Sequence, residues 1–313
     1  MKNPLHHIIL ENFLTASGNS VAIPLSYETF GLPLHTAPVV LVNHALTGNS
    51  TVAGAKGWWQ KAAGEGASID TRRFTVLAFN IPGNGYDGHA VQNYHDFICG
   101  DIARIFLAGL AKLKIEKLHS MIGGSLGAAI GWEMLALKPN LAEYFIPIAS
   151  DFRTSDWLHA QCLVQEFLLN TEDEPLQKAR IHAMLCYRTP QSLNGRFNLE
   201  RGDDQKLLSE NWLHFHGKAL SERFTLNAYK LMNRLLKTIN ADATALKKIT
   251  AEIHLVAVNS DLFFPSFEIH KCYEHLRKSD VTVVYHEIDS VHGHDAFLIE
   301  YEQLNKILKT IYI

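Results

Sequence analysis

The sequence predicts an α/β fold built on a mostly parallel central sheet with flanking helices and a helical segment inserted between two of its strands. Three observations support this prediction. Short apolar runs without polar alternation recur along the chain, helical patterns separate several of them, and residues 150–252 carry helical periodicity alone. Continuous apolar runs are typical of strands buried on both faces, and the order strand, helix, strand produces parallel pairing through crossovers.

The individual elements follow from the periodicity of apolar residues. Residues 7–14 and 20–30 alternate in polarity around a Ser-Gly-Asn turn, which predicts an opening antiparallel hairpin. Buried strands are expected at 38–42, 74–78, 118–122, 144–148, 253–258 and 281–285, with helices at 102–113 and 126–137. Helices are also expected at 157–169, 177–187, 204–220 and 225–239, interrupted at Thr189-Pro190 and Gly195. We therefore expect an α/β core of residues 1–150 and 250–313 and a helical cap of residues 151–249.

Composition narrows the possible functions. The 313 residues carry 29 Lys and Arg against 32 Asp and Glu, a net charge of -3, so no basic excess is available for nucleic acid or an anionic membrane. Four widely spaced cysteines without a CxxC pair favour neither a disulfide framework nor a zinc site, and the 17 histidines form no metal-binding pattern. No apolar run suits a signal peptide or a membrane span. We expect a soluble cytoplasmic protein with small-molecule partners and no metal.

The segment Gly123-Gly124-Ser125-Leu126-Gly127 fits the pattern G-x-S-x-G. It follows an apolar strand and opens a helix, so Ser125 would occupy a sharp turn with its hydroxyl at the carboxyl edge of the sheet. This is the context of the nucleophile in the α/β-hydrolase fold, which is therefore the fold that we expect. A helix start capped by the serine is the structural alternative. A dinucleotide loop is disfavoured, because the glycine spacing G-x-G-x-x-G is absent.

A serine nucleophile needs a base and a carboxylate that orients the base. On this fold the three residues occur in the order Ser, Asp, His. Asp261 comes just after the strand at 253–258, which places it at the same edge of the sheet as Ser125. A turn-opening role before a proline is the alternative for this aspartate. Asp289 and Asp151 are weaker candidates for the catalytic carboxylate.

The base is chosen by position among many histidines. His294 follows the last strand by a short loop and precedes a closing helix, where this fold carries its base. His292 lies in the same loop and remains a competitor. His286 continues the strand and is expected to pack or to face solvent.

The oxyanion of an acyl-enzyme reaction needs two backbone N–H donors, one from the residue after the nucleophile and one from the loop after the third strand. Leu126 is the expected first donor. The segment 43–48 follows the strand at 38–42, and Leu46 within it is the expected second donor. A glycine-ended turn without a chemical role is the alternative for this segment.

Several blocks of sequence, in order from residue 44 to residue 298, resemble the homoserine O-acetyltransferase family. They are HALTG at 44–48 with VAG at 52–54 and GWW at 57–59, IDTRRF at 69–74, GGS at 123–125, DLFFP at 261–265 and GHDAFL at 293–298. The resemblance implies ping-pong acyl transfer through acylated Ser125, from an acyl-coenzyme A to the hydroxyl of an amino acid. It implies acetyl-coenzyme A as co-substrate without a permanently bound cofactor, homoserine as acceptor, a role in methionine or cysteine synthesis, and a homodimer formed through the cap.

Within the cap, residues 180–188 (RIHAMLCYR) resemble the family segment that binds the amino-acid substrate. The resemblance assigns Arg180 and Tyr187 to this site, with Asp295 as partner of the substrate ammonium. An arginine fork can hold a carboxylate through two hydrogen bonds, and a carboxylate can pair with an ammonium group. An exposed helix charge at Arg180 and a core aromatic ring at Tyr187 are the structural alternative.

The chain also departs from the family pattern in two places. After Asn80 the residues IPGNGYD replace a Leu-Gly-Gly-Cys-like run and a longer loop, and after Ser125 the residues LGAA replace a Met-Gly-Gly run. Both segments adjoin the acyl and acceptor sites, so the identity of both groups stays open. An esterase or thioesterase is the alternative enzyme, and a catalytically silent binding protein is a third hypothesis. The amino-acid-binding residues named above favour transfer.

Overall fold

The computed structural model describes residues 4–313. In this range one 8-stranded sheet has the order β1-β2-β6-β3-β7-β8-β9-β10. Its strands are β1 (His6–Leu14), β2 (Ser20–Gly31), β3 (Val39–Asn43), β6 (Thr75–Phe79), β7 (Leu118–Gly124), β8 (Ala142–Ile148), β9 (Glu252–Val258) and β10 (Val283–Ile288). The β1–β2 and β2–β6 pairs are antiparallel and the remaining pairs are parallel, which confirms the opening hairpin and the mostly parallel sheet. The short strands β4 (Ala63–Gly64) and β5 (Ile69–Asp70) pair separately.

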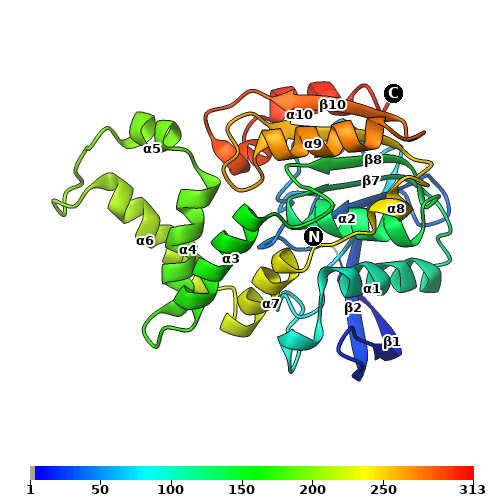
Figure 1. Ribbon diagram of the computed structural model, residues 1–313, viewed down its shortest axis with the longest axis horizontal. Coiled ribbons are helices and arrows are strands. Elements are labelled where there is room, and N and C mark those ends of the chain that lie inside the picture. The colour runs from blue at the N-terminus through cyan, green and yellow to red at the C-terminus, as the bar shows by residue number, and fades with distance from the viewer. Residues whose placement is uncertain (1–3) are drawn as a thin grey trace.

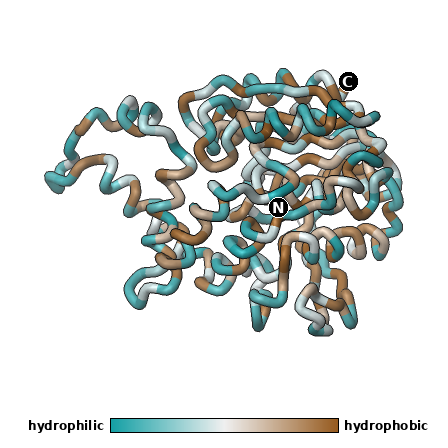
Figure 2. Tube along the Cα trace, in the orientation of Figure 1, coloured by the Kyte–Doolittle hydropathy of each residue, from teal (hydrophilic) through white to brown (hydrophobic). Residues whose placement is uncertain are grey.

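Both faces of the sheet are buried at its central strands, whereas the edge strands β1 and β10 are partly exposed. Alternate residues of β9 belong to two different apolar clusters, with Ile253 and Leu255 in one and Val256 and Val258 in the other. Helices α1 (Cys99–Lys112), α2 (Leu126–Leu137) and α9 (Ser266–Arg277) contribute to the first cluster, and α10 (Tyr301–Leu308) contributes to the second. Figure 2 shows hydrophobic residues concentrated along these central strands. A strand covered on both faces has no polar alternation, which explains the continuous apolar runs.

The chain between β8 and β9 is helical, and we call it the cap. Its helices are α3 (Asp156–Leu169), α4 (Pro175–Tyr187), α5 (Pro190–Phe197), α6 (Leu208–Ser221), α7 (Leu226–Lys237) and α8 (Ala243–Leu246). Figure 1 shows α3 to α7 gathered on one side of the sheet, with α5 and α6 farthest from it. Helix α4 packs against α3 and α6, whereas α8 returns to contact α2 of the core. Among residues 4–313, no helix is long and apolar enough to cross a membrane.

Two expectations for the cap were wrong in detail. The chain does break at Thr189-Pro190, between α4 and a helix that the sequence did not predict, α5, which starts there because the Thr189 side chain accepts a hydrogen bond from the N–H of Ser192 and Pro190 occupies the first turn. Gly195 lies inside that helix. Helix α6 begins at Leu208 and not at residue 204, since residues 201 and 207 pair across a tight turn.

Candidate active site

Ser125 occupies a strained turn between β7 and α2. Its φ of 55° and ψ of -127° lie where residues with a side chain are rarely found. A Cβ on Gly127 would lie 2.3 Å from the carbonyl oxygen of Asn43, and one on Gly124 would lie 2.6 Å from the ring of Phe297. The turn therefore packs closely against the loop after β3 on one side and against the 3-10 helix η2 (Gly293–Leu298) on the other. Ser125 itself is only 3% exposed.

Asp261 and His294 form a buried hydrogen-bonded pair. The distance from His294 Nδ1 to Asp261 Oδ2 is 2.7 Å, and both residues are buried. The other oxygen of Asp261 accepts from the N–H groups of Phe263 at 2.7 Å and Phe264 at 2.9 Å. Because a carboxylate only accepts, Nδ1 carries the proton and the lone pair of His294 is on Nε2.

Ser125 and His294 lie at one edge of the sheet without a direct hydrogen bond. The hydrogen bonds within residues 4–313 do not include one from Ser125 Oγ to His294 Nε2. Such bonds are often long in free enzymes and shorten when substrate binds. The imidazole is surrounded by aromatic rings, whose centres lie 5.0 Å away for Phe263, 5.5 Å for Tyr187 and 5.8 Å for Phe297. This apolar surrounding strengthens the Asp261 contact.

The competing histidines and carboxylates have other partners. His292 Nδ1 lies 2.8 Å from Ser192 Oγ in α5, and His286 Nε2 lies 3.0 Å from His254 Nδ1 in the neighbouring strand. Asp289 accepts from the side chain of Asn259 at 2.5 Å. None of these three groups bonds to His294 among the described residues.

Asp151, the remaining candidate for the catalytic carboxylate, follows β8 and lines a hollow away from the Asp261–His294 pair. It lines a hollow with Cys272, Glu268 and Lys271 of α9. Burial raises the pKa of its carboxyl to about 7, although the N–H of Phe152 bonds to it. The geometry therefore separates Asp151 from the His294 pair.

The proposed oxyanion loop is held by a residue that the sequence analysis did not single out. His44 is 1% exposed, its Nδ1 donates to the Ala45 carbonyl at 2.8 Å, and its Nε2 accepts from the N–H of Ile81 at 3.0 Å. Burial lowers the pKa of His44 to about 4, so the ring is neutral and can accept at Nε2. Its place in the HALTG block was the only sequence signal for this role.

The N–H groups of the two expected oxyanion donors have no backbone acceptor in the described chain. The N–H of Leu46 takes part in no backbone hydrogen bond of the described chain. Leu126 is the first residue of α2, where backbone N–H groups have no intrahelical acceptor. The Asn43 side chain donates to the Gly127 carbonyl at 3.2 Å and joins the two segments.

Of the expected acceptor residues, Tyr187 lies beside the imidazole and Arg180 lies beside Tyr187. Tyr187 of α4 contacts the His294 ring, and the guanidinium carbon of Arg180 lies 5.7 Å from the Tyr187 ring centre. Asp295 is already paired, because its Oδ2 accepts from Arg188 Nε at 3.0 Å. Sequence reasoning missed Arg188, whose only signal was its position next to Tyr187.

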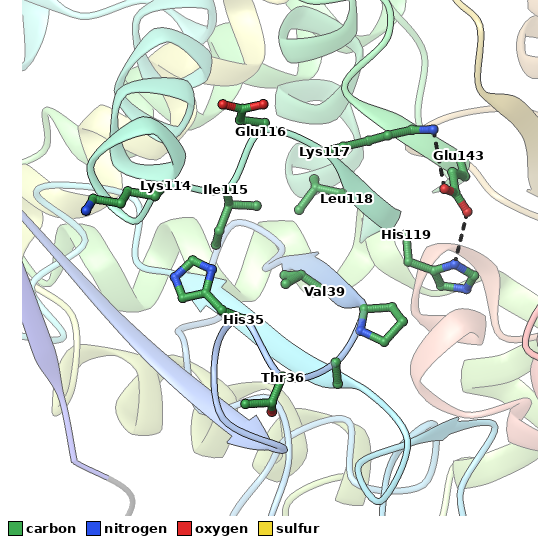
Figure 3. Close-up of a pocket in the computed structure, with 12 residues that line it drawn as sticks. His35, Thr36, Val39, Lys114, Ile115, Glu116, Lys117, Leu118, His119 and Glu143 are labelled. Atoms are coloured by element: carbon green, nitrogen blue, oxygen red, sulfur yellow. Dashed lines mark ion pairs between the residues drawn. The ribbon is translucent and has the colours of Figure 1, made fainter.

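Figure 3 shows a separate hollow at the opposite ends of the strands. It is lined by the starts of β3 and β7, and Lys117 and His119 face Glu143 there at 3.3 and 3.5 Å. Sites in parallel sheets form at the carboxyl ends of the strands, so this hollow is not part of the candidate site. The side chains of residues 4–313 provide no cluster of three or more His, Cys, Asp or Glu that could hold a metal ion.

Comparison with known proteins agrees with this architecture. Residues 38–301 match the family model of the alpha/beta hydrolase fold. The homoserine O-acetyltransferase of Cyclobacterium marinum is 30% identical, over 92% of this chain and 89% of that relative. The crystal structure of homoserine O-acetyltransferase from Staphylococcus aureus has a TM-score of 0.85 at 25% identity, with 99% and 95% of the two chains covered. Esterase E22 has a TM-score of 0.89 at 17% identity with 100% of both chains covered, a likeness of fold alone. The predicted fold class is confirmed.

Proposed function

Because the chain belongs to the homoserine O-acetyltransferase family of the α/β-hydrolase fold, we propose that it transfers an acyl group from acyl-coenzyme A to the hydroxyl of an amino acid. Family membership makes the chain an acyltransferase. The finer description is our proposal: homoserine as acceptor, acetyl-coenzyme A as donor, and a cytoplasmic role in methionine or cysteine synthesis. The observation that carries it is the His294–Asp261 pair at the sheet edge that also bears Ser125.

In the proposed first half-reaction, Ser125 Oγ attacks the thioester carbonyl while its proton passes to His294 Nε2. The N–H groups of Leu46 and Leu126 stabilise the oxyanion of the tetrahedral intermediate. Its collapse breaks the carbon–sulfur bond. Coenzyme A leaves with the proton from His294, and the acyl group remains as an ester on Ser125.

In the proposed second half-reaction, the hydroxyl of the acceptor gives its proton to His294 Nε2 and its oxygen attacks the Ser125 ester. The same two N–H groups stabilise the second oxyanion. The ester bond to Ser125 breaks, its oxygen regains the proton from His294, and the O-acyl amino acid leaves. The aromatic rings around His294 limit the access of water, which would otherwise compete with the acceptor.

We assign Arg180, Tyr187 and Asp295 to the acceptor. Arg180 supplies the fork for the carboxylate, and Tyr187 packs between that fork and His294. Asp295 uses Oδ2 for Arg188, which leaves Oδ1 for the ammonium group. An amino acid held at both charged ends would present its side-chain hydroxyl to the base.

The alternative is an esterase or thioesterase, which the fold likeness to esterase E22 fits. Coenzyme A release from acetyl-coenzyme A, measured with and without homoserine, separates the two functions. The proposal expects release that increases with homoserine and yields O-acetylhomoserine. Release at the same rate without homoserine, with acetate as product, selects the hydrolase. Ser125→Ala is the control and should release nothing in either case.

We also propose that the cap, residues 151–249, forms a homodimer. Helix α3 carries several exposed apolar side chains, with Phe167 67% exposed, Trp157 52% exposed and two aliphatic side chains between them, although Trp157 Nε1 donates to the Leu262 carbonyl. Exposed apolar surface of this kind marks contacts between proteins. Sedimentation should detect a dimer that Phe167→Glu converts to a monomer. Leu137→Glu, at a site on α2 of the core that is 53% exposed, should leave the dimer intact; a wild-type monomer would contradict the proposal.

A further inference from the structure

Arg223 connects the cap to the oxyanion loop. It lies in the short connection between α6 and α7, and its Nη1 donates to the Thr47 carbonyl at 2.9 Å. Thr47 directly follows Leu46, the proposed oxyanion donor. The guanidinium carbon also lies 5.6 Å from the Phe224 ring centre. The Arg223 guanidinium of the cap is therefore held next to the proposed oxyanion loop.

Two cations at this place have no counter-ion. Within residues 4–313, no carboxylate forms an ion pair with Arg180 or Arg223. Arg223 adjoins the candidate site through the Thr47 carbonyl, and Arg180 adjoins it through the Tyr187 ring. Burial and the charge of Arg180 both lower the pKa of the Arg223 guanidinium. Arg188, in contrast, is neutralised by Asp295. Two cations without a counter-ion that border the same site favour the binding of an anion there.

We propose that Arg223 is a second carboxylate-binding residue of the acceptor site and that it shares the substrate carboxylate with Arg180. The inference rests on the proposed transfer to an amino acid. A carboxylate has two oxygens with several lone pairs, so it can accept from two guanidinium groups at once. Arg223 thereby determines specificity for acceptors that carry a carboxylate.

The position of Arg223 indicates which substrate supplies that carboxylate. In homoserine only a few bonds separate the carboxylate from the reacting hydroxyl, which suits an arginine held next to Leu46. The phosphates of coenzyme A are separated from the thioester by the whole pantetheine arm, so they do not suit this place. A carboxylate on the acyl group, as in a succinyl donor, is the other source at short range, and the experiment includes it.

The test compares two acceptors in the second half-reaction. Enzyme acetylated with acetyl-coenzyme A is mixed with homoserine or with homoserine amide, in which a neutral carboxamide replaces the carboxylate, and single-turnover transfer is measured. Arg223→Gln should lower kcat/KM for homoserine by roughly 10-fold or more, the scale of one charge-assisted hydrogen bond, and change the value for the amide by less than about 3-fold. Arg223→Lys should restore part of the preference, since it keeps the charge but not the fork. Arg196→Gln, an exposed arginine of α5, is the matched control and should keep the wild-type preference.

Three results would overturn the inference. Equal losses for both acceptors would reduce Arg223 to a structural tie to Thr47, and unchanged kinetics would remove it from the site. Slower acylation by succinyl-coenzyme A than by acetyl-coenzyme A in Arg223→Gln, with an unchanged acceptor preference, would assign the residue to the donor. Wild-type protein without homoserine-dependent transfer would refute the proposed function itself, a result that is distinct from these three.

Discussion

Acidification should weaken the fold through His44. This imidazole is buried beneath the oxyanion loop, where its Nε2 accepts from the N–H of Ile81 and its Nδ1 donates to Ala45. Burial lowers its pKa to about 4. Protonation would place two donors opposite each other at Nε2 and would leave a charge in a fully buried place. The loop that carries Leu46 would then lose its support.

The size of the effect follows from the difference in proton binding between the native and unfolded states. An unfolded histidine titrates near 6.5, so between pH 6.5 and pH 4 the unfolded chain binds a proton that the native chain does not. The unfolding free energy therefore falls as the pH falls. With a native pKa of about 4, the loss due to His44 between pH 7 and pH 4.5 is about 2.5 kcal/mol.

Urea unfolding of wild-type protein and His44→Gln at several pH values measures this contribution. The variant should be less stable at pH 7, because it fits the buried site less well, but it should lose about 2.5 kcal/mol less on acidification. Other titrating groups are common to both proteins and cancel in the difference. His7→Gln, on the exposed start of β1, should follow the wild-type pH dependence. Parallel curves for wild type and His44→Gln, within about 0.5 kcal/mol, would refute the reasoning.

Four further outcomes are expected. Ser125→Ala should form no acyl adduct in intact-protein mass spectrometry and should lose several orders of magnitude in turnover; an adduct on the variant would exclude this serine. His294→Ala should be nearly as damaging, whereas His292→Ala should mainly change affinity or stability, and the reverse order of single-turnover acylation rates would exchange their roles. Arg180→Ala should leave acylation within a few-fold of wild type but lower kcat/KM for the acceptor by roughly 100-fold; unchanged acceptor kinetics would return it to a surface charge. Asp151→Asn should raise the unfolding free energy at pH 8 by at most about 4 kcal/mol, because a carboxyl whose pKa is raised to about 7 makes the native state less stable as the pH rises from 4 to 7; equal urea midpoints at pH 8 would contradict this.

The sequence predicted the core of the fold because its signals are local. Strand β3 is buried along its whole length, so its apolar run identifies it without knowledge of its partners. The G-x-S-x-G turn predicted the start of α2 correctly, because the pattern places the helix directly after the serine. The start of α5 was not predictable in the same way. Thr-Pro can end one helix or begin another, and a contact from Thr189 to the distant Val291 accompanies the second outcome here.

In the candidate site too, local sequence signals predicted some residues, whereas contacts made only in the folded chain could not be predicted. Chain order on the fold led to Asp261 and His294, and the structure brings them within hydrogen-bonding distance. The support of His44 depends on Ile81, which lies 37 residues away, and the pairing of Arg188 with Asp295 spans 107 residues. Neither pairing follows from periodicity or from a motif, because burial and distance in the folded chain decide both.

The way in which the cap contacts the catalytic edge explains why the fold alone cannot identify the reaction. Arg188 connects α4 to Asp295, the neighbour of the proposed base, and Arg223 connects the start of α7 to the oxyanion loop. Both contacts are made by charged side chains that also border the proposed acceptor site. An esterase can share the sheet, the cap and the nucleophile turn without needing these charges, since water has no carboxylate to orient. On the proposed function, transfer and hydrolysis would differ in a few cap side chains rather than in the fold, and the fold likeness to esterase E22 is compatible with both reactions.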